Sequence, residues 1–152
     1  MSKPTILILS IVYLASVLIV GIFGMQVMSF NNVNYIESIT INLQEVEFSD
    51  NQIPYILQED ETENPDEKRY TIVCSYSNNL TIFANPIIVA KDPTLDATNR
   101  NLRITKDNND DSIVYENGVF KVNKIPLNRS VEFTFYSQDS SNKFMTITLV
   151  VI

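Results

Sequence analysis

Between Pro4 and Ile36 the chain carries no charged side chain, and the twenty residues from Ile6 to Met25 are almost all apolar. Thirteen of these twenty are Ile, Leu, Val or Phe, so their insertion into a bilayer as a helix is favoured by about 4 to 8 kcal/mol before the polar residues are counted. A helix of this length rises ~30 Å, which matches the hydrocarbon thickness of a membrane. The stretch therefore predicts a transmembrane helix over residues 6–28, between an N-terminal segment 1–5 and a polar spacer 29–35.

A cleaved secretory signal is the competing interpretation of this stretch. Such a signal has an apolar region of about 7 to 15 residues followed by a small-x-small cleavage site, whereas here the run is longer and is followed by no such site. Lys3 precedes the run, and no further base occurs before Lys68. By the positive-inside tendency we expect a single-pass protein of the plasma membrane. Its N-terminus would be cytoplasmic, residues 6–28 would contact membrane lipid, and the body would be extracytoplasmic.

The body that follows the apolar stretch is acidic. It carries ten bases and all eighteen acids, a net charge of about −8, so nucleic acid is not an expected partner, because like charges repel. Cys74 is the only cysteine, and the chain has no histidine, which is the commonest general base and a frequent metal ligand. These features argue against an enzyme, and we expect no catalytic, cofactor-binding or metal-binding residues.

From Ile36 onward the hydrophobic pattern has the two-residue period of β-strands. The first segment places Ile36 on one side of a strand and Ile39 and Ile41 on the other. The same alternation occurs in the later runs RYTIVCSYS, SVEFTFYS and FMTITLVVI, the last of which ends the chain. Short strands separated by turn signals, without a helical period, predict an all-β sandwich of about seven strands over residues 36–152.

Three single features refine this expectation. Cys74 alternates in phase with apolar residues, so we expect a buried and inert thiol. Asn117-Gly118 separates two β-rich runs, and this dipeptide tolerates the positive φ angles of a type I′ turn, which predicts a tight hairpin. Pro86 interrupts the run NLTIFANPIIVA, and because proline lacks a donor for the ladder it indicates an edge or a break.

Two acidic segments raise the question of a cation site. Residues 49–68 contain two prolines and several acids, a composition that favours a solvated loop, with Ca²⁺ binding as the alternative. Asp107, Asn109 and Asp111 are spaced like the first ligands of an EF-hand. However, Ser112 stands where the sharp turn needs glycine, and Gly118 stands where a bidentate Glu is required. An Asx-rich turn that leads into the hairpin explains this second segment.

Paired carboxylates are the remaining candidates for chemistry. Glu45 and Glu47 fall on one exposed face of the predicted first strand. A glycosidase needs two carboxylates across a cleft, one of them in an apolar pocket. No acid in the body falls on an apolar face, so the pair predicts a solvated surface.

Several short motifs occur in an order that resembles the bacterial immunoglobulin-like domains of group 2. They are the strand ITINL from Ile39, the segment PTLDATN that ends at Asn99, the Asn117-Gly118 turn, and the F-x-V pattern from Phe120. The resemblance covers residues 36–152. It departs from the family pattern at Leu102, where a Trp is often found, in the scarcity of glycine, and in the long acidic insert. The resemblance implies an extracytoplasmic module used in adhesion or as a spacer, and hence a binding or structural role.

These observations leave more than one function open. The first is a membrane-anchored immunoglobulin-like protein that binds or braces a protein partner in the cell envelope or in a surface complex. The second is a pilin-like filament subunit that assembles through its apolar helix, although no basic leader and no carboxylate at the fifth position of the apolar run are present. A third possibility is self-association or strand addition through the final strand, TLVVI, which ends without a polar tail.

Overall fold

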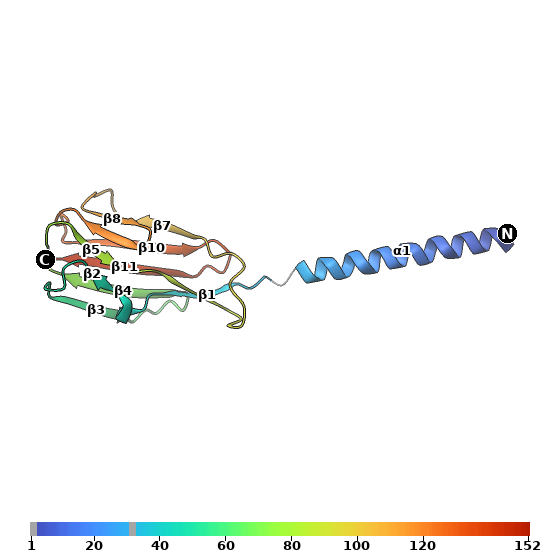
Figure 1. Cartoon of the computed structure of the whole chain (residues 1–152), viewed down its shortest axis with the longest axis horizontal. Coiled ribbons are helices and arrows are strands. Elements are labelled where there is room, and N and C mark those ends of the chain that lie inside the picture. Colours follow the sequence, from blue (N-terminus) through green and yellow to red (C-terminus); the bar gives the residue numbers. More distant parts are fainter. Residues whose placement is uncertain (1–2, 31–32) are drawn as a thin grey trace. The chain divides into compact units, whose positions relative to one another are not determined.

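The computed structural model describes residues 3–30 and 33–152 of the chain, as one helix followed by a β-rich body. The helix and the residues from Asn34 to Ile152 form separate compact units, each described by itself (Figure 1). Residues 1–2 of the predicted N-terminal segment and residues 31–32 of the predicted spacer lie outside the described residues. The division into a helical part and a β-rich part follows the change of hydrophobic period near Ile36.

Helix α1 spans Lys3–Phe30. Pro4 lies in its first turn, where a missing backbone N–H costs no intrahelical hydrogen bond. The Ser10 and Ser16 hydroxyls donate to the carbonyl oxygens of Ile6 and Tyr13, at 2.9 and 2.8 Å, so both polar groups are satisfied along the helix surface. The window Pro4–Gly21 has a mean hydropathy of 2.3 and no buried residue. By length and composition, α1 is able to cross a membrane.

Eleven strands make up the described part of the body. The five-stranded sheet has the order β3 (Tyr55–Asp60), β4 (Glu67–Cys74), β11 (Phe144–Val151), β10 (Ser130–Ser137) and β7 (Leu102–Lys106). The four-stranded sheet has the order β2 (Glu47–Phe48), β5 (Leu80–Phe83), β9 (Val119–Val122) and β8 (Ile113–Glu116). The two-stranded sheet contains β1 (Ile36–Thr40) and β6 (Ile87–Ala90).

The hydrophobic core lies between the five-stranded and four-stranded sheets, which is the arrangement of a β-sandwich. Phe120 on β9 contacts Phe133 on β10 edge to face, with ring centroids 5.1 Å apart. Tyr115 on β8 meets Phe135 in the same way, at 5.0 Å. Aromatic pairs in this geometry add about 0.5 to 1.5 kcal/mol beyond the area they bury. The predicted alternation of the long strands β4, β10 and β11 is confirmed, because their inward residues are buried. Thr146 of β11 is an exception, since it lies on the other face and is buried as well.

The first strand differs from its prediction. Ile36 and Ile39 are both buried, although a regular strand would place them on opposite faces. The register shifts between Ile36 and Ser38, and such a bulge lets two residues of odd spacing face the core together. The strand ends at Thr40 and is followed by a 3-10 turn at Leu43–Glu45. The predicted single strand face that carries both Glu45 and Glu47 is therefore wrong, since Glu45 lies on the turn.

Strands β1 and β6 extend the pairing of β2 with β5. Thr40 of β1 is opposite Ile87 of β6, and Glu47 of β2 is opposite Phe83 of β5. Pro86 lies in the interval between the two paired stretches, as predicted for a residue that breaks a ladder. The 3-10 turn fills the corresponding interval in the partner strand.

The predicted Asn117-Gly118 hairpin is confirmed. The two residues have φ angles of 51° and 82°, and Glu116 pairs with Val119 across the turn. Glycine has a second reason to be here, because a Cβ at Gly118 would lie 1.7 Å from Oδ1 of Asn85. The Gly118 carbonyl also accepts from the Ala84 N–H at 2.9 Å. The turn thus fixes both the hairpin and the break between β5 and β6.

The structure corrects the expected solvated loop and does not support the third possibility, strand addition through the final strand. The acidic segment 49–68 is not a loop throughout, since it contains β3 and the start of β4. The final strand, β11, is not an edge, because it lies between β4, to which it runs parallel, and β10, to which it runs antiparallel. Strand β3, which the acidic segment supplies, forms this edge of the five-stranded sheet instead.

Candidate binding surface at the β3 edge

The side of Tyr55–Asp60 that faces away from β4 is called the β3 edge here. Strand β3 pairs with β4 from Tyr55↔Cys74 to Asp60↔Arg69 without a register shift. No other strand in the described part of the chain pairs with it, and β3 lies along the lower border of the body in Figure 1. The backbone groups on this edge are therefore free to pair with another strand.

Local sequence explains why this segment forms a strand. Tyr55, Ile56 and Leu57 follow Pro54, whose carbonyl oxygen accepts from the Ser75 N–H at 3.4 Å. The Tyr55 ring stacks on Phe48 of β2, with centroids 4.2 Å apart. Aromatic and β-branched residues favour strands, and the stacked ring holds the start of β3 against the second sheet. This apolar triplet was the sequence signal for β3, and the surrounding acids concealed it.

One end of the β3 edge is apolar. Tyr55 and Ile56 are 48% and 59% exposed. Ile56 is opposite Val73, and Val73 is in turn beside Val150 on β11. Residues opposite each other share a face of the sheet, so these three aliphatic side chains form a row on the solvent side of the five-stranded sheet. Val73 and Val150 are half-buried and Ile56 is exposed, so the row ends in apolar surface at the free edge.

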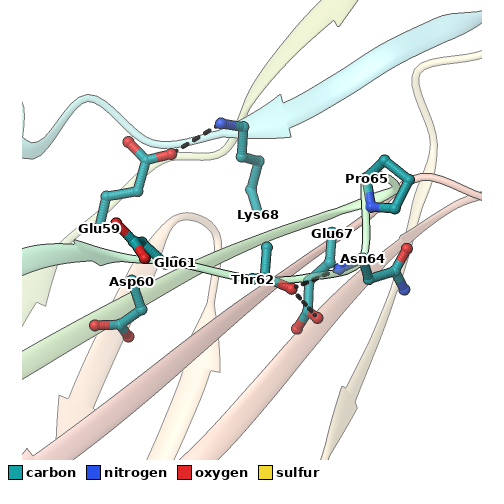
Figure 2. Close-up of a pocket in the computed structure, with 8 residues that line it drawn as sticks. All are labelled: Glu59, Asp60, Glu61, Thr62, Asn64, Pro65, Glu67 and Lys68. Carbon is teal, nitrogen blue, oxygen red and sulfur yellow. Dashed lines mark hydrogen bonds and ion pairs between the residues drawn. The ribbon is translucent and has the colours of Figure 1, made fainter.

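The other end of the edge is acidic and hollowed. An open hollow of about 580 Å³ is lined by Glu59, Asp60, Glu61, Thr62, Asn64, Pro65, Glu67 and Lys68. Figure 2 shows Glu59 reaching toward Lys68 on one side of the strand, whereas Asp60 points away from that pair. The Lys68 ammonium lies 2.9 Å from Oε1 of Glu59, and this hydrogen bond, with the negative charge, raises the pKa of Lys68. Lys68 is the only base in the lining, so the hollow keeps an excess of negative charge.

Two further acids that line the hollow, Asp60 and Glu67, are held by neighbouring side chains. Asp60 accepts from the Thr71 hydroxyl at 2.6 Å and from the Gln58 amide at 2.7 Å. Arg69 bridges Glu67 and Glu132, at 2.8 and 3.0 Å. These bonds fix the carboxylates in separate directions. They do not converge on a common centre.

The structure gives no support to the calcium alternative. Within residues 3–30 and 33–152, no group of three or more His, Cys, Asp or Glu side chains is placed to hold a metal ion. In the EF-hand-like segment, the Asn108 side chain accepts from the Asp110 N–H, and Asp110 accepts from the Ser112 N–H, at 3.0 and 2.9 Å. These are the Asx turns that the sequence predicted, and they use Asn108 and Asp110, neither of which is in the set of expected ligand positions.

Cys74 lies directly inside the β3 edge. It is fully buried, as predicted, and is opposite Tyr55 on β3 and beside Val151 on β11. Burial raises the pKa of its thiol to about 11. The nucleophilic thiolate is therefore scarce at neutral pH, so the residue serves packing.

A second cluster ties the start of the body to a loop that was named in the motif comparison. The Asn34 side chain donates to the carbonyl oxygens of Asp92, Leu95 and Asp96, at 3.0 to 3.3 Å, and accepts from the Asp92 N–H. The Asn34 backbone exchanges hydrogen bonds with Thr98. The segment PTLDATN thus folds around Asn34. No local pattern indicates this partner, because it lies about sixty residues away in the chain.

Searches with the sequence and the structure against protein families, curated proteins and solved structures find no match to this chain.

Proposed function

We propose that this protein is a single-pass membrane protein whose extracytoplasmic β-sandwich binds or braces a protein partner in the cell envelope. The proposal rests on the presence of two different units in one chain. One is an apolar helix with 18 uncharged residues of mean hydropathy 2.3, and the other is a separate acidic β-rich unit. Lys3 is the only base before the first acid of the body, which favours a cytoplasmic N-terminus.

We further propose that the body is immunoglobulin-like. Seven of its strands, β2, β5, β7, β8, β9, β10 and β11, support this. In an immunoglobulin constant-type domain the first, second, fifth and fourth strands form one sheet, and the third, sixth and seventh form the other. The orders β2-β5-β9-β8 and β7-β10-β11 correspond to this pattern strand by strand. On this scheme β3 and β4 are an insert between the first and second strands, and β1 and β6 lengthen those two.

Binding is favoured over catalysis by the chemistry of the chain. The sequence lacks histidine, and the one cysteine is buried with a raised pKa. The exposed features are a free strand edge, an apolar row and an acidic hollow. These are means of contacting another macromolecule.

Membrane topology is the direct test. The full chain with an epitope tag after Ile152 is expressed in bacterial cells, and intact cells are treated with a protease. We expect the tag to be lost from intact cells and the chain to stay in the membrane pellet after alkaline washing. Leu14→Arg should reduce insertion, because a charge at the helix centre costs about 2.5 to 3.5 kcal/mol, whereas Leu14→Ala should not. A body protected in intact cells, or a shortened soluble chain, would overturn the proposal.

The partner is sought by crosslinking in native membranes, followed by mass spectrometry. A different envelope protein crosslinked to the body would support the binding role. Filaments of this chain seen by negative stain would replace the proposal with the pilin-like alternative.

A further inference from the structure

We propose that the β3 edge binds an extended segment of the partner protein by strand addition, and that this segment has a basic end and an apolar end. The inference rests on the proposed binding function and specifies its surface and the chemistry of the partner. The added strand would hydrogen-bond to the free backbone of Tyr55–Asp60 and become the sixth strand of the five-stranded sheet.

Among the sheet edges of the described residues, β3 is the longest and the least protected. Its six residues contain no proline, no lysine and no register shift, three of the devices that keep edges from pairing, and its charged residues, Glu59 and Asp60, lie together at one end. The edges of the four-stranded sheet, β2 and β8, have two and four residues. The opposite edge of the five-stranded sheet, β7, carries Arg103 and Lys106.

The apolar end of the edge is rigid as well as exposed. Tyr55 is held by its stack on Phe48, and Ile56 is continuous with Val73 across the sheet. A strand laid beside β3 would cover part of the 48% and 59% of Tyr55 and Ile56 that now faces solvent. Because the stack on Phe48 already orders the Tyr55 ring, covering that ring costs little conformational entropy.

The negative charge of the β3 edge determines which kind of partner is able to bind there. Glu59, Asp60 and Glu61 follow the apolar residues, and Lys68 is the only base in the hollow beside them. A second copy of this chain would bring another body of net charge about −8 to the same place, and like charges oppose such pairing. A segment with lysine or arginine at the acidic end is complementary to it. The occupant is therefore a basic and apolar segment of another protein.

The register of the added strand follows from sheet geometry. Antiparallel pairing is somewhat more stable per residue than parallel pairing, and directly opposite residues share a face. In that orientation the partner's basic residues come first, opposite Asp60 and Glu59. Its apolar residues follow, opposite Leu57, Ile56 and Tyr55.

A synthetic peptide with the sequence lysine-arginine-threonine-valine-isoleucine-valine is the probe for this register. It is fluorescently labelled and titrated with the full chain in detergent micelles at low salt, with anisotropy as the signal. We expect saturable binding with a dissociation constant on the order of 100 µM. Hydrogen-deuterium exchange should show slower exchange over residues 55–60 when the peptide is bound, and unchanged exchange over β7.

Two matched comparisons separate strand addition from general attraction to an acidic protein. Glu59 and Glu116 are both exposed glutamates that pair with a lysine, at 2.9 and 2.7 Å, on different sheets. Glu59→Lys should weaken peptide binding about three- to tenfold, while Glu116→Lys, with the same change of net charge, should leave it nearly unchanged. A peptide methylated on the amides that face β3 should lose binding at least about tenfold, because those amides no longer donate.

Each outcome decides the inference. No binding, equal weakening by the two lysine variants, equal binding of the methylated peptide, or protection elsewhere than residues 55–60 would overturn it. These failures leave the proposed function standing if membrane crosslinking still captures an envelope partner through another surface. A body found on the cytoplasmic side would instead overturn the proposed function, while peptide binding to the β3 edge would be unaffected.

Discussion

The two edges of the five-stranded sheet are built from similar amounts of chain, yet they differ in how their polar groups are used. Strand β3 has six residues and β7 has five, and each pairs with a single neighbour. At β3 the exposed groups are an apolar pair, Tyr55 and Ile56, and an excess of acid. At β7 Ile104 is also exposed, at 44%, and the basic side chains of Arg103 and Lys106 contact neighbouring groups of the body.

The two basic side chains of β7 make contacts with other parts of the body. The Arg103 guanidinium lies 4.9 Å from the centre of the Tyr136 ring on β10. The Lys106 ammonium donates to the carbonyl oxygens of Asp110, in the loop that follows, and of Ile113, at the start of β8. Both cations stand on the strand itself, and charged side chains on an edge strand oppose pairing with another strand. Edge length alone therefore does not identify a binding edge. The side chains along the edge decide whether another strand is able to pair with it.

The largest expected effect comes from the middle of the sheet, which supports both edges. Ile72 on β4 is fully buried, and Ile72→Ala should lower the free energy of unfolding by about 2 to 4 kcal/mol through lost burial and a cavity. Chemical denaturation of the full chain in micelles, followed by circular dichroism of the strands, measures this. Hydrogen exchange should quicken at both edges. Faster exchange at β3 alone would mean that the edges are stabilised independently.

The next effect is confined to the interior of the β3 edge and depends on pH. Burial raises the pKa of Cys74 from its ordinary value of 9.0 to about 11, so the stability it contributes is complete below pH 9. Above pH 9 the unfolded chain releases the thiol proton first, and about 2 to 3 kcal/mol should be lost by pH 11 or slightly above. Denaturation midpoints at several pH values test this. The Cys74→Ala variant should be less stable than the wild type at pH 8, but its free energy of unfolding should fall less steeply as the pH rises. Parallel curves for the two proteins would contradict a raised pKa of Cys74.

Substituting one lysine at each edge compares how much the two edges contribute to stability. Lys106→Met should cost about 1 to 3 kcal/mol, because a partly buried ammonium donates to two backbone carbonyls that would lose their partner. Lys68→Met should cost less than about 1 kcal/mol, because its pair with Glu59 is exposed at 44% and 48%. Unfolding free energies of both variants give the comparison. Equal losses would mean that the β7 edge is no more firmly closed than the β3 edge.

The smallest effect concerns the ring contact on β7. Arg103→Leu should cost about 0.5 to 1 kcal/mol by removing the cation from the Tyr136 ring. Arg100→Leu is the control, since Arg100 makes only an exposed ion pair with Asp96 in the described contacts, and it should change stability by less than about 0.5 kcal/mol. A larger loss for Arg100→Leu would sink the view that the ring contact secures this edge.

Much of the fold could be predicted where a residue's neighbours in sequence decide its environment. The long alternations of β4, β10 and β11, the buried Cys74 and the hairpin at Gly118 depend on local periodicity and backbone conformation. The candidate surface could not be predicted in this way. Strand β3 was hidden in an acidic composition, because an edge strand buries few of its side chains and so leaves only the weak signal of Tyr55 to Leu57.

The order of the strands in the sheet could not be predicted from local sequence patterns either. The alternation of β11 is the same whether one or both of its sides are paired, so only the parallel addition of β4 placed it in the interior. The bulge beside Ile36 and the bonds from Asn34 to the segment 92–98 likewise depend on groups distant in the chain.

The amino-acid sequence by itself determined that an apolar helix precedes an acidic β-rich body, because hydrophobic period and charge are properties of consecutive residues. Only the tertiary structure decided which strands stand at the edges and therefore which backbone groups remain unpaired. The physical reason is that a strand satisfies its hydrogen bonds through partners elsewhere in the chain. A free edge is thus a property of the assembled sheet and of no single segment.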